Sequence, residues 1–262
     1  MNLTEKYGKW ACVAGAAEGL GKAFAEGLAK RGFHLILIDH KKEVLADTTV
    51  TLQNRYQVEI TSLSLELGNR DSIEPIIKSM NEKACRFLVY NAAYGPVKPF
   101  LSNTTEELDF YLKVNMETPI QLIHKLTQIH DKAPLGIMLV SSLAGWRGTQ
   151  LVVPYAATKA WTWNLAEGLY YEFQDTNLAI SVCCPGGTDT PNFQSTNPKM
   201  TLFSPKAMSP EKVADEALRK FGKKLFIFPG FSNKLAHFIL NRVLPRKIAS
   251  GIHNHTMKKL YG

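Results

Sequence analysis

The chain has 262 residues, of which 45% are hydrophobic and 21% are charged, and its formal net charge is +8. This length accommodates one large α/β domain whose core needs no disulfide or metal, and the composition excludes disordered and fibrous proteins. The sequence has no uninterrupted apolar run of about 18 residues, the length that spans a bilayer. Residues 1–9 lack the apolar core of a signal peptide, so we expect a cytoplasmic protein.

The positive charge is concentrated at the carboxyl end. Residues 217–262 contain ten Lys or Arg and no Asp or Glu, whereas the preceding 216 residues contain 21 basic and 23 acidic side chains. The body of the protein therefore has no basic bias of the kind that marks a nucleic-acid surface. We expect no nucleic-acid partner.

Short apolar runs alternate with amphipathic segments along the chain. Strands are predicted at residues 9–14, 34–39, 58–65, 86–91, 136–142, 179–184 and 225–228, and helices at 20–31, 71–83, 105–130 and 155–173. Runs such as 35–38 are apolar throughout, which is typical of parallel strands buried on both faces. The pattern predicts a Rossmann-like, doubly wound α/β fold with a seven-stranded parallel sheet and helices on both faces, in one domain over residues 1–230.

The four cysteines show no Cys-x-x-Cys zinc spacing, and three of them, Cys12, Cys183 and Cys184, lie in apolar runs. We expect reduced, buried cysteines that behave as small hydrophobic side chains, and no metal site.

A glycine-rich turn follows the first predicted strand and precedes a helix. It contains Gly15, Ala17, Glu18, Gly19, Leu20 and Gly21. Glycines let the backbone turn tightly and approach a diphosphate, and the helix N-terminus then offers N–H groups and the positive end of its dipole. The turn therefore predicts a dinucleotide site, although its Gly-x-x-x-Gly-x-Gly spacing differs from the commoner Gly-x-Gly-x-x-Gly.

Asp39 ends the second predicted strand, 18 residues after Gly21. A carboxylate there accepts a hydrogen bond from the adenosine ribose 2′-hydroxyl and repels a 2′-phosphate, which favours NAD. His40, Lys41 and Lys42 follow directly and could neutralise a 2′-phosphate, so NADP is the alternative.

Tyr155 and Lys159 are four residues apart in a predicted helix, so both side chains lie on one helix face. A tyrosine with a pKa of about 10 is a poor acid or base at neutral pH, and a neighbouring ammonium lowers that pKa. Ser142 ends the preceding strand, at the sheet edge where ligands bind, and can hold a substrate oxygen. Asn115 lies inside the predicted helix 105–130 and suggests a kink or a water anchor.

These motifs together resemble the short-chain dehydrogenase/reductase family over residues 5–230. The glycine-rich turn, Asn91-Ala92-Ala93, Asn115, Ser142, Tyr155 with Lys159, and residues 185–190 occur in the family's order and spacing. The resemblance implies that Tyr155 is the general acid/base and that Ser142 orients the substrate. It implies that Lys159 lowers the pKa of Tyr155 and binds ribose, while Asn115 holds a water linked to Lys159.

The resemblance also implies the remaining cofactor contacts and the reaction. Asn91, Glu66 and Leu67 would lie on the adenosine side. Pro185, Gly186, Thr188 and Thr190 would hold the phosphates and the nicotinamide carboxamide. The reaction would be hydride transfer between the nicotinamide and an alcohol or carbonyl carbon. The assembly would be a homodimer or homotetramer, packed through the helices at Thr105 and Tyr155.

The chain departs from the family pattern near the adenosine side. Ala14 replaces the usual threonine before the first glycine, Tyr90 and Ala93 flank Asn91-Ala92 in place of Asn and Gly, and Glu66 replaces an aspartate. None of the four catalytic positions is affected, so we expect activity.

Residues 191–210 follow the cofactor threonine at the place where the family covers its substrate. We expect these residues to form a lid whose apolar side chains, Phe193, Met200 and Phe203, contact the substrate. We expect Trp146, which follows the predicted strand that ends at Ser142, to contact the substrate as well. An apolar lid predicts a lipid-like, steroid-like or aromatic alcohol or ketone as the small-molecule substrate. The alternative is that these side chains only pack the loop.

Residues 231–262 form a basic amphipathic extension of the domain. A helix predicted from 231 to 244 places Leu235, Phe238, Ile239 and Val243 on one stripe. We expect this stripe to dock on the domain or on a neighbouring subunit. Peripheral contact with an anionic membrane is the alternative.

Two other functions remain open at this point. One is an NADPH-dependent ketoreductase, including an acyl-chain reductase, and the other is a non-catalytic dinucleotide-binding sensor or scaffold. The presence of Ser142, Tyr155, Lys159 and Asn115 together argues against the second, because binding alone does not need all four.

Overall fold

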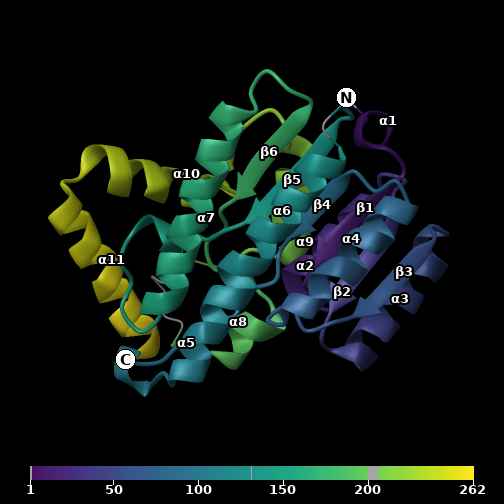
Figure 1. Cartoon of the computed structure of the whole chain (residues 1–262). Helices are drawn as coiled ribbons and strands as arrows, with labels where there is room; N and C mark the ends of the chain where they lie inside the picture. Colours follow the sequence, from purple (N-terminus) through teal and green to yellow (C-terminus); the bar gives the residue numbers. More distant parts are fainter. Residues whose placement is uncertain (1, 131, 200–205) are drawn as a thin grey trace.

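One parallel sheet forms the centre of the protein (Figure 1). The computed structural model describes residues 2–130, 132–199 and 206–262. Neighbouring strands are all parallel, in the order β3-β2-β1-β4-β5-β6-β7. Their bounds are β1 Trp10–Ala14, β2 His34–Asp39, β3 Ile60–Ser64, β4 Phe87–Tyr90, β5 Leu135–Val140, β6 Leu178–Cys183 and β7 Phe226–Ile227. The predicted seven-stranded Rossmann-like sheet is confirmed.

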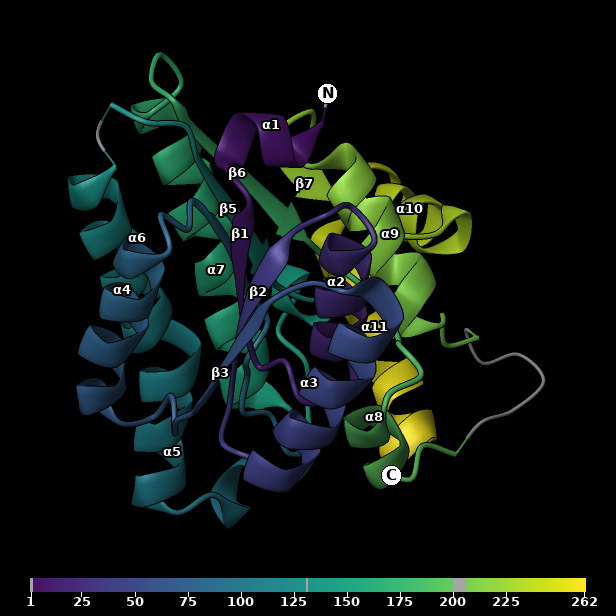
Figure 2. The ribbon, with the colours of Figure 1, turned by 90° about the vertical axis from the view of Figure 1, so that its right-hand side faces the viewer.

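Helices cover both faces of the sheet, as Figure 2 shows from the side. One face carries α1 (Leu3–Tyr7), α2 (Gly19–Ala29), α3 (Lys42–Tyr56) and α9 (Pro210–Lys220), and the other carries α4 (Ile73–Glu82), α5 (Thr105–Leu112), α6 (Thr118–Ile129) and α7 (Val153–Glu172). In β2, Leu35 and Leu37 are buried in the first core, while Ile36 and Ile38 are buried in the second. Burial on both sides explains why this strand is apolar throughout.

Several elements have no counterpart among the sequence predictions. They are α1, α3, α8 (Pro191–Ser195), α9, α11 (Arg246–Tyr261) and the short turns η1 (Arg70–Ser72), η2 (Phe100–Ser102) and η4 (Leu143–Trp146). In α3 the buried side chains are Leu45, Thr48 and Leu52, so most of the helix is polar and its apolar period is weak.

The helix predicted at 105–130 is broken by a π-helical turn, η3 (Lys113–Glu117), between α5 and α6. Pro119 lacks an N–H group and cannot donate to the carbonyls of Val114 or Asn115 one turn earlier. The Tyr90 hydroxyl donates to the Val114 carbonyl instead, over 2.6 Å. Tyr90 is one of the residues that depart from the family pattern. Its hydroxyl group therefore satisfies a carbonyl group of the π-helical turn.

The tail consists of α10 (Phe231–Phe238), the π-helical turn η5 (Ile239–Val243) and α11, and it projects on the left of Figure 1. The predicted helix 231–244 corresponds to α10 and η5, and Pro245 separates it from α11. Within residues 2–130, 132–199 and 206–262, no helix has the length and hydrophobicity needed to cross a bilayer. All four cysteines are free and buried, as predicted.

Replacing Tyr90 by Phe removes the donor to Val114 and leaves a buried carbonyl unsatisfied. We expect the free energy of unfolding to fall by about 1–3 kcal/mol, with the fold retained. Urea denaturation followed by circular dichroism measures this change. An unchanged midpoint would show that the hydroxyl does not stabilise the break.

Candidate active site

A cavity of about 1240 Å³ runs along the carboxyl edge of the sheet, from Asp39 at the end of β2 to Tyr261 in α11. Ligands bind at this edge where the strand order reverses, here between β1 and β4. Most of the predicted site residues line the cavity: Gly15, Glu18, Gly19, Leu20, Asp39, Glu66, Leu67, Asn91, Ser142, Trp146, Tyr155, Lys159, Pro185, Gly186, Thr188, Thr190 and Phe193.

The turn after β1 is too tightly packed for larger side chains. Gly15 has a φ of 77°, and a Cβ atom on Gly21 would lie 1.7 Å from the Gly15 carbonyl oxygen. Asn91 Nδ2 donates to the same oxygen over 2.9 Å, which ties the turn to the end of β4. Ala17 and Gly21 are buried behind the cavity rather than lining it, so they shape the turn.

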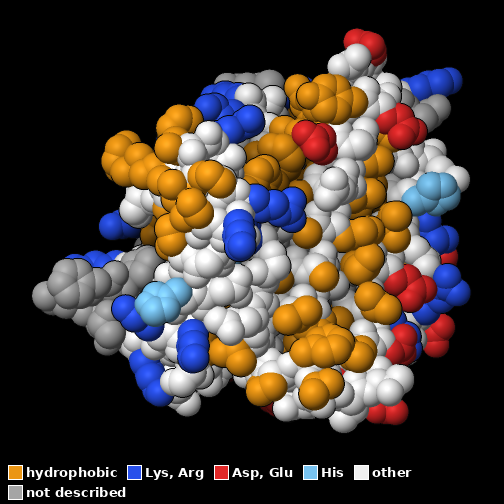
Figure 3. All heavy atoms as spheres, turned by 90° about the vertical axis from the view of Figure 1, so that its left-hand side faces the viewer, with side chains coloured by type: hydrophobic (Ala, Val, Ile, Leu, Met, Phe, Trp, Pro, Cys, Tyr) orange, Lys and Arg blue, Asp and Glu red, His pale blue; other side chains and the backbone are white. Residues whose placement is uncertain are grey.

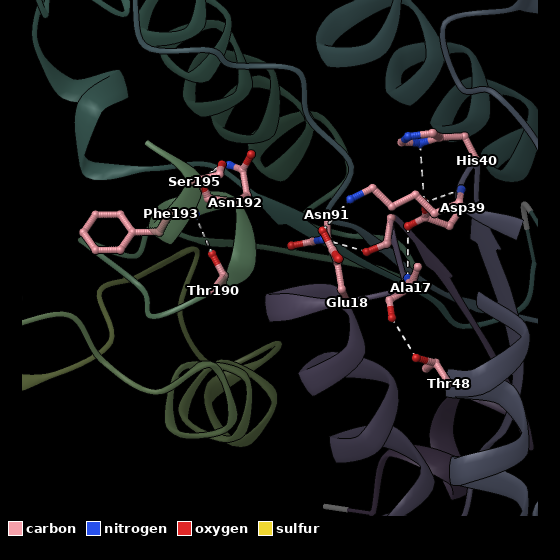
Figure 4. Close-up of polar contacts among 12 residues, drawn as sticks. Ala17, Glu18, Asp39, His40, Thr48, Asn91, Thr190, Asn192, Phe193 and Ser195 are labelled. Atoms are coloured by element: carbon pink, nitrogen blue, oxygen red, sulfur yellow. Dashed lines mark hydrogen bonds and ion pairs between the residues drawn. The ribbon is translucent and has the colours of Figure 1, made fainter. Parts of the chain in front are cut away.

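Asp39 organises the end of the cavity where adenosine is expected (Figure 4). Its carboxylate accepts hydrogen bonds from Ala17 N over 3.0 Å and from Lys41 N over 3.1 Å. The Lys41 ammonium forms a 2.7 Å ion pair with Glu18, and His40 Nδ1 lies 3.4 Å from Asp39 Oδ1. Each carboxylate oxygen of Asp39 can still accept a further hydrogen bond.

The first turn of α2 is available to a phosphate. Glu18 is the N-cap of α2, but its side chain makes no capping hydrogen bond and pairs with Lys41 instead. The N–H groups and the positive dipole end of the helix therefore face the cavity at Gly19 and Leu20, which line it. Together with the close packing at Gly21, this arrangement fits an NAD(P) diphosphate.

Residues 185–190 form the facing wall of the cofactor end. Thr188 pairs with Met208 in an isolated parallel bridge. Thr190 is the N-cap of α8, and its hydroxyl accepts from Phe193 N over 3.2 Å (Figure 4). A Cβ atom on Gly19 would lie 3.1 Å from the Thr190 side chain, so the two walls meet closely at this point.

Ser142, Tyr155 and Lys159 converge at the centre of the cavity. Ser142 follows β5 and is the N-cap of η4, while Tyr155 and Lys159 lie on one face of α7. Lys159 Nζ donates to the Val140 carbonyl over 2.7 Å and lies 5.6 Å from the centre of the Tyr155 ring. Gly95 packs on that ring, because a Cβ atom there would lie 2.4 Å from it.

Burial shifts the pKa values of both groups on α7. It raises the pKa of the Tyr155 hydroxyl, and the hydrogen bond with Ser142 opposes that rise only in part. It lowers the pKa of Lys159 to about 8. The lowering of the Tyr155 pKa by Lys159 that we expected is therefore not found in this geometry. Burial of the hydroxyl is the main cause of the raised pKa, and the Lys159 ammonium donates to the Val140 carbonyl.

Asn115 lies in the η3 turn, outside the main cavity. Its side chain accepts from Tyr94 N over 2.8 Å and donates to Tyr94 O and to Thr158 Oγ1, each over 2.9 Å. A second cavity of about 10 Å³ is lined by Asn115, Lys159 and Val140, among other residues. Its volume is about that of one water molecule. The predicted kink is confirmed, while the water anchor stays a prediction.

The substrate side is only partly as predicted. Trp146 and Phe193 line the cavity, whereas Met200 and Phe203 lie outside the described residues. A wall that was not predicted comes from the tail: Ser232, Asn233, Ala236, His237, Leu240, Asn241, Ile252, His253, Thr256, Met257, Leu260 and Tyr261 line the cavity. These residues recur at helical spacing, three or four positions apart, along α10 and η5 and again along α11. That spacing is the sequence signal that could have identified this wall.

The apolar stripe of the tail does not dock on the domain, which corrects that part of our expectation, whereas docking on a neighbouring subunit stays a prediction. Leu235, Phe238, Ile239 and Val243 are exposed. The opposite side of α10 packs inward through His237, whose ring stacks on Phe228 with 3.9 Å between centroids. The small side chain of Ala236 and the flat ring of His237 therefore lie on the side of α10 that faces the domain, and the bulkier apolar side chains of the stripe lie on the exposed side.

Hydrogen bonds hold α11 against the loop that follows the serine strand. Asn254 Oδ1 accepts from Gln150 N over 2.8 Å, and Asn254 Nδ2 donates to Gly148 O over 3.0 Å. His253 Nε2 lies 3.0 Å from Thr149 Oγ1. Ala249 is the buried residue of α11, so polar contacts rather than apolar burial fix this wall. We call these contacts the tail clasp.

Replacing Asn254 by Ala removes the contacts of the tail clasp with Gln150 N and Gly148 O and leaves the one between His253 and Thr149. We expect faster proteolytic cleavage within α11 and unchanged cofactor affinity, because the glycine-rich turn is remote from the clasp. The matched control is His255→Ala, which alters the exposed neighbouring side chain. Equal cleavage rates for the wild type and Asn254→Ala would contradict the clasp.

Comparison with known proteins agrees with this geometry. The sequence profile of the family described as short chain dehydrogenase matches residues 9–201. A 7beta-hydroxysteroid dehydrogenase from Clostridium sardiniense is 30% identical over 235 residues, covering 89% of this chain and 90% of that protein. Hydroxysteroid dehydrogenase-like protein 1 from Gallus gallus is 27% identical over 95% of this chain and 76% of its own length.

Solved structures share the whole architecture. A 7beta-hydroxysteroid dehydrogenase superposes with a TM-score of 0.87 at 25% identity, over 97% of this chain and 99% of that chain. A short-chain dehydrogenase from Sphingobium yanoikuyae in complex with NADPH superposes with a TM-score of 0.77 at 21% identity, over 95% of each chain, which shows the fold alone. The chain belongs to the short-chain dehydrogenase/reductase family and is an NAD(P)-dependent oxidoreductase that acts on alcohol and carbonyl groups.

Proposed function

We propose that this oxidoreductase interconverts a bulky, apolar secondary alcohol and its ketone, of the size of a hydroxysteroid, with Tyr155 as the general acid/base. The observation that carries the proposal is the convergence of Ser142, Tyr155 and Lys159 in one cavity whose other end is the glycine-rich turn. The nicotinamide supplies or accepts the hydride when bound.

Each catalytic side chain has a distinct role in ketone reduction. Ser142 donates a hydrogen bond to the substrate oxygen and stabilises the negative charge that develops on it. The Tyr155 hydroxyl transfers its proton to that oxygen as the hydride reaches the carbonyl carbon. The Lys159 ammonium stabilises the resulting phenolate. Alcohol oxidation runs the same proton transfer in reverse.

The small cavity beside Asn115 supports a proton path to Lys159. A water there would lie between the η3 turn and the buried ammonium. Asn115 is a positioning residue in this proposal, because its side chain holds Tyr94 and Thr158 rather than the reacting atoms.

The substrate class rests on the walls of the cavity and on the relatives. The lining at the substrate end is rich in apolar side chains, among them Trp146, Phe193, Leu240 and Met257. Pockets lined in this way hold apolar ligands and use few polar groups for orientation. A relative that is 30% identical and a solved structure with a TM-score of 0.87 are both described as 7beta-hydroxysteroid dehydrogenases.

An acyl-chain reductase is the second candidate. Very-long-chain 3-oxoacyl-CoA reductase-A from Danio rerio is 28% identical, but the match covers 70% of this chain and 59% of that protein. A panel of 3-oxoacyl thioesters and oxosteroids, followed by the absorbance of the reduced nicotinamide, separates the two candidates. Turnover of the thioesters alone would favour the second.

We also propose a homodimer or homotetramer packed through α5 and α7. Large apolar side chains are exposed on these helices, among them Leu112, Val153 and Tyr171. Analytical ultracentrifugation tests this assembly, and a monomer at all concentrations would reject it.

Replacing Tyr155 by Phe removes the proton donor and keeps the packing of the ring on Gly95. We expect turnover to fall by about 10²–10⁴-fold with cofactor affinity nearly unchanged. Stopped-flow absorbance and fluorescence titration of the cofactor measure the two effects. Turnover near that of the wild type would refute the role of Tyr155.

The pH dependence should differ between the two directions. Because burial raises the pKa of Tyr155, its hydroxyl stays protonated at neutral pH and ketone reduction should be constant there. Alcohol oxidation needs the phenolate, so its rate should rise as the pH increases from neutral to about 8, where the Lys159 ammonium that stabilises the phenolate begins to lose its proton. Initial rates against pH in both directions test this, and an oxidation rate that falls between neutral pH and about pH 8 would contradict it.

NAD is the preferred cofactor in our proposal. Asp39 places a carboxylate at the adenosine end, and Glu18 neutralises Lys41, the cation best placed to receive a 2′-phosphate. We expect the wild type to bind NADH more tightly than NADPH. Glu18→Gln, which frees Lys41, should raise NADPH affinity selectively, as measured by quenching of protein fluorescence. Tighter NADPH binding by the wild type would overturn this preference.

A further inference from the structure

Large apolar side chains are exposed together on one side of the tail. Phe231 is 79% exposed, Phe238 is 56% exposed and Val243 is 60% exposed. Leu235 and Ile239 are also exposed and fall on the same helical stripe as Phe231 and Phe238. Scattered exposed hydrophobic residues are ordinary, whereas a contiguous group on one element marks an interaction site. We call this stripe, with Val243, the outer face of the tail.

Exposed cations without an ion-pair partner among the described residues lie in the same part of the tail. Arg242, Arg246 and Lys247 are exposed, and none of them forms an ion pair with another residue in the described ranges. The sequence contains no Asp or Glu from 217 to 262 that could neutralise them within the tail. Figure 3 shows Lys and Arg side chains among hydrophobic ones on the face that carries the tail, with most Asp and Glu side chains towards the right of the view.

The outer face is not needed by the catalytic site. The side of α10 and η5 that lines the cavity carries Asn233, Ala236, His237 and Leu240 instead. The two sides of α10 therefore have separate surroundings, and substitutions on one need not alter the other. The exposed stripe is a feature that the oxidoreductase activity does not explain.

We propose that the outer face of the tail docks this enzyme on an anionic lipid surface. The apolar side chains of Phe231, Leu235 and Phe238 would enter the boundary between headgroups and acyl chains, and Arg242, Arg246 and Lys247 would contact the lipid phosphates. A helix with an apolar face and basic residues beside it binds anionic interfaces by these two terms together.

Charge argues against the other occupants. A second copy related by a two-fold axis would bring the same cations of both chains face to face, because an isologous interface pairs a patch with itself. A nucleic acid would match the charge of Arg242 and Lys247, but the aliphatic side chains of Leu235, Ile239 and Val243 have no counterpart on a phosphate backbone. A lipid surface satisfies both components.

Co-sedimentation of the full chain with vesicles tests the proposal. We expect binding to vesicles of phosphatidylcholine with phosphatidylglycerol, weak binding to phosphatidylcholine alone, and loss of binding as salt is raised. Arg242→Glu with Lys247→Glu should weaken binding by at least about tenfold. Phe231→Ser with Phe238→Ser should weaken it comparably while leaving cofactor affinity unchanged.

A matched control separates the outer face from net charge. Lys78→Glu with Lys132→Glu makes the same change in net charge at two exposed positions outside the tail. This control should bind vesicles as the wild type does. Absence of vesicle binding by the wild type, or equal loss in the control, would overturn the proposal. Dimerisation or binding of single-stranded DNA that is abolished by the tail variants, without vesicle binding, would also overturn it.

Discussion

The contact between the Lys159 ammonium and the Val140 carbonyl joins the two elements on which the site depends. It attaches α7 to the end of β5, and the Ser141 hydroxyl reinforces it by donating to the Lys159 carbonyl over 2.8 Å. Desolvation of a buried cation is unfavourable, and the lowered pKa of Lys159 records that cost. The same contact helps to hold Tyr155 within hydrogen-bonding reach of Ser142, which is the arrangement that the proposed proton transfer requires.

The η3 turn is the second constraint on the site. Tyr90, which departs from the family pattern, compensates there for a proline inside a helical segment. A proline inside a helical segment removes a donor and leaves earlier carbonyls to find other partners. Tyr90 supplies one such partner from the end of β4. The π-helical turn also carries Asn115, whose side chain bonds to Tyr94 and Thr158 and so connects the η3 turn to the loop after β4 and to α7. Such π-helical turns often occur at functional sites.

Local patterns predicted the sheet well and placed Tyr155 and Lys159 together in one cavity, but they predicted long-range packing much less well. The seven strands and the pairing of Tyr155 with Lys159 follow from apolar runs and helical spacing, which need only neighbouring residues. The tail was misread because an apolar stripe does not tell which side of a helix meets the domain. The contact of Asn254 with Gln150 joins residues 104 positions apart and has no local signature. The raised pKa of Tyr155 likewise depends on burial that only the folded chain creates.

The tail clasp has a kinetic consequence, because it is built from hydrogen bonds with little apolar burial beneath them. Segments of this kind open with a free energy well below that of global unfolding. The substrate wall can therefore detach and return many times without disturbing the sheet, the glycine-rich turn or α7. In enzymes whose cavity is covered by a segment that opens locally, release of the product rather than the chemical step commonly limits turnover. We expect the residence time of the product to be set by how often Asn254 releases the loop after β5.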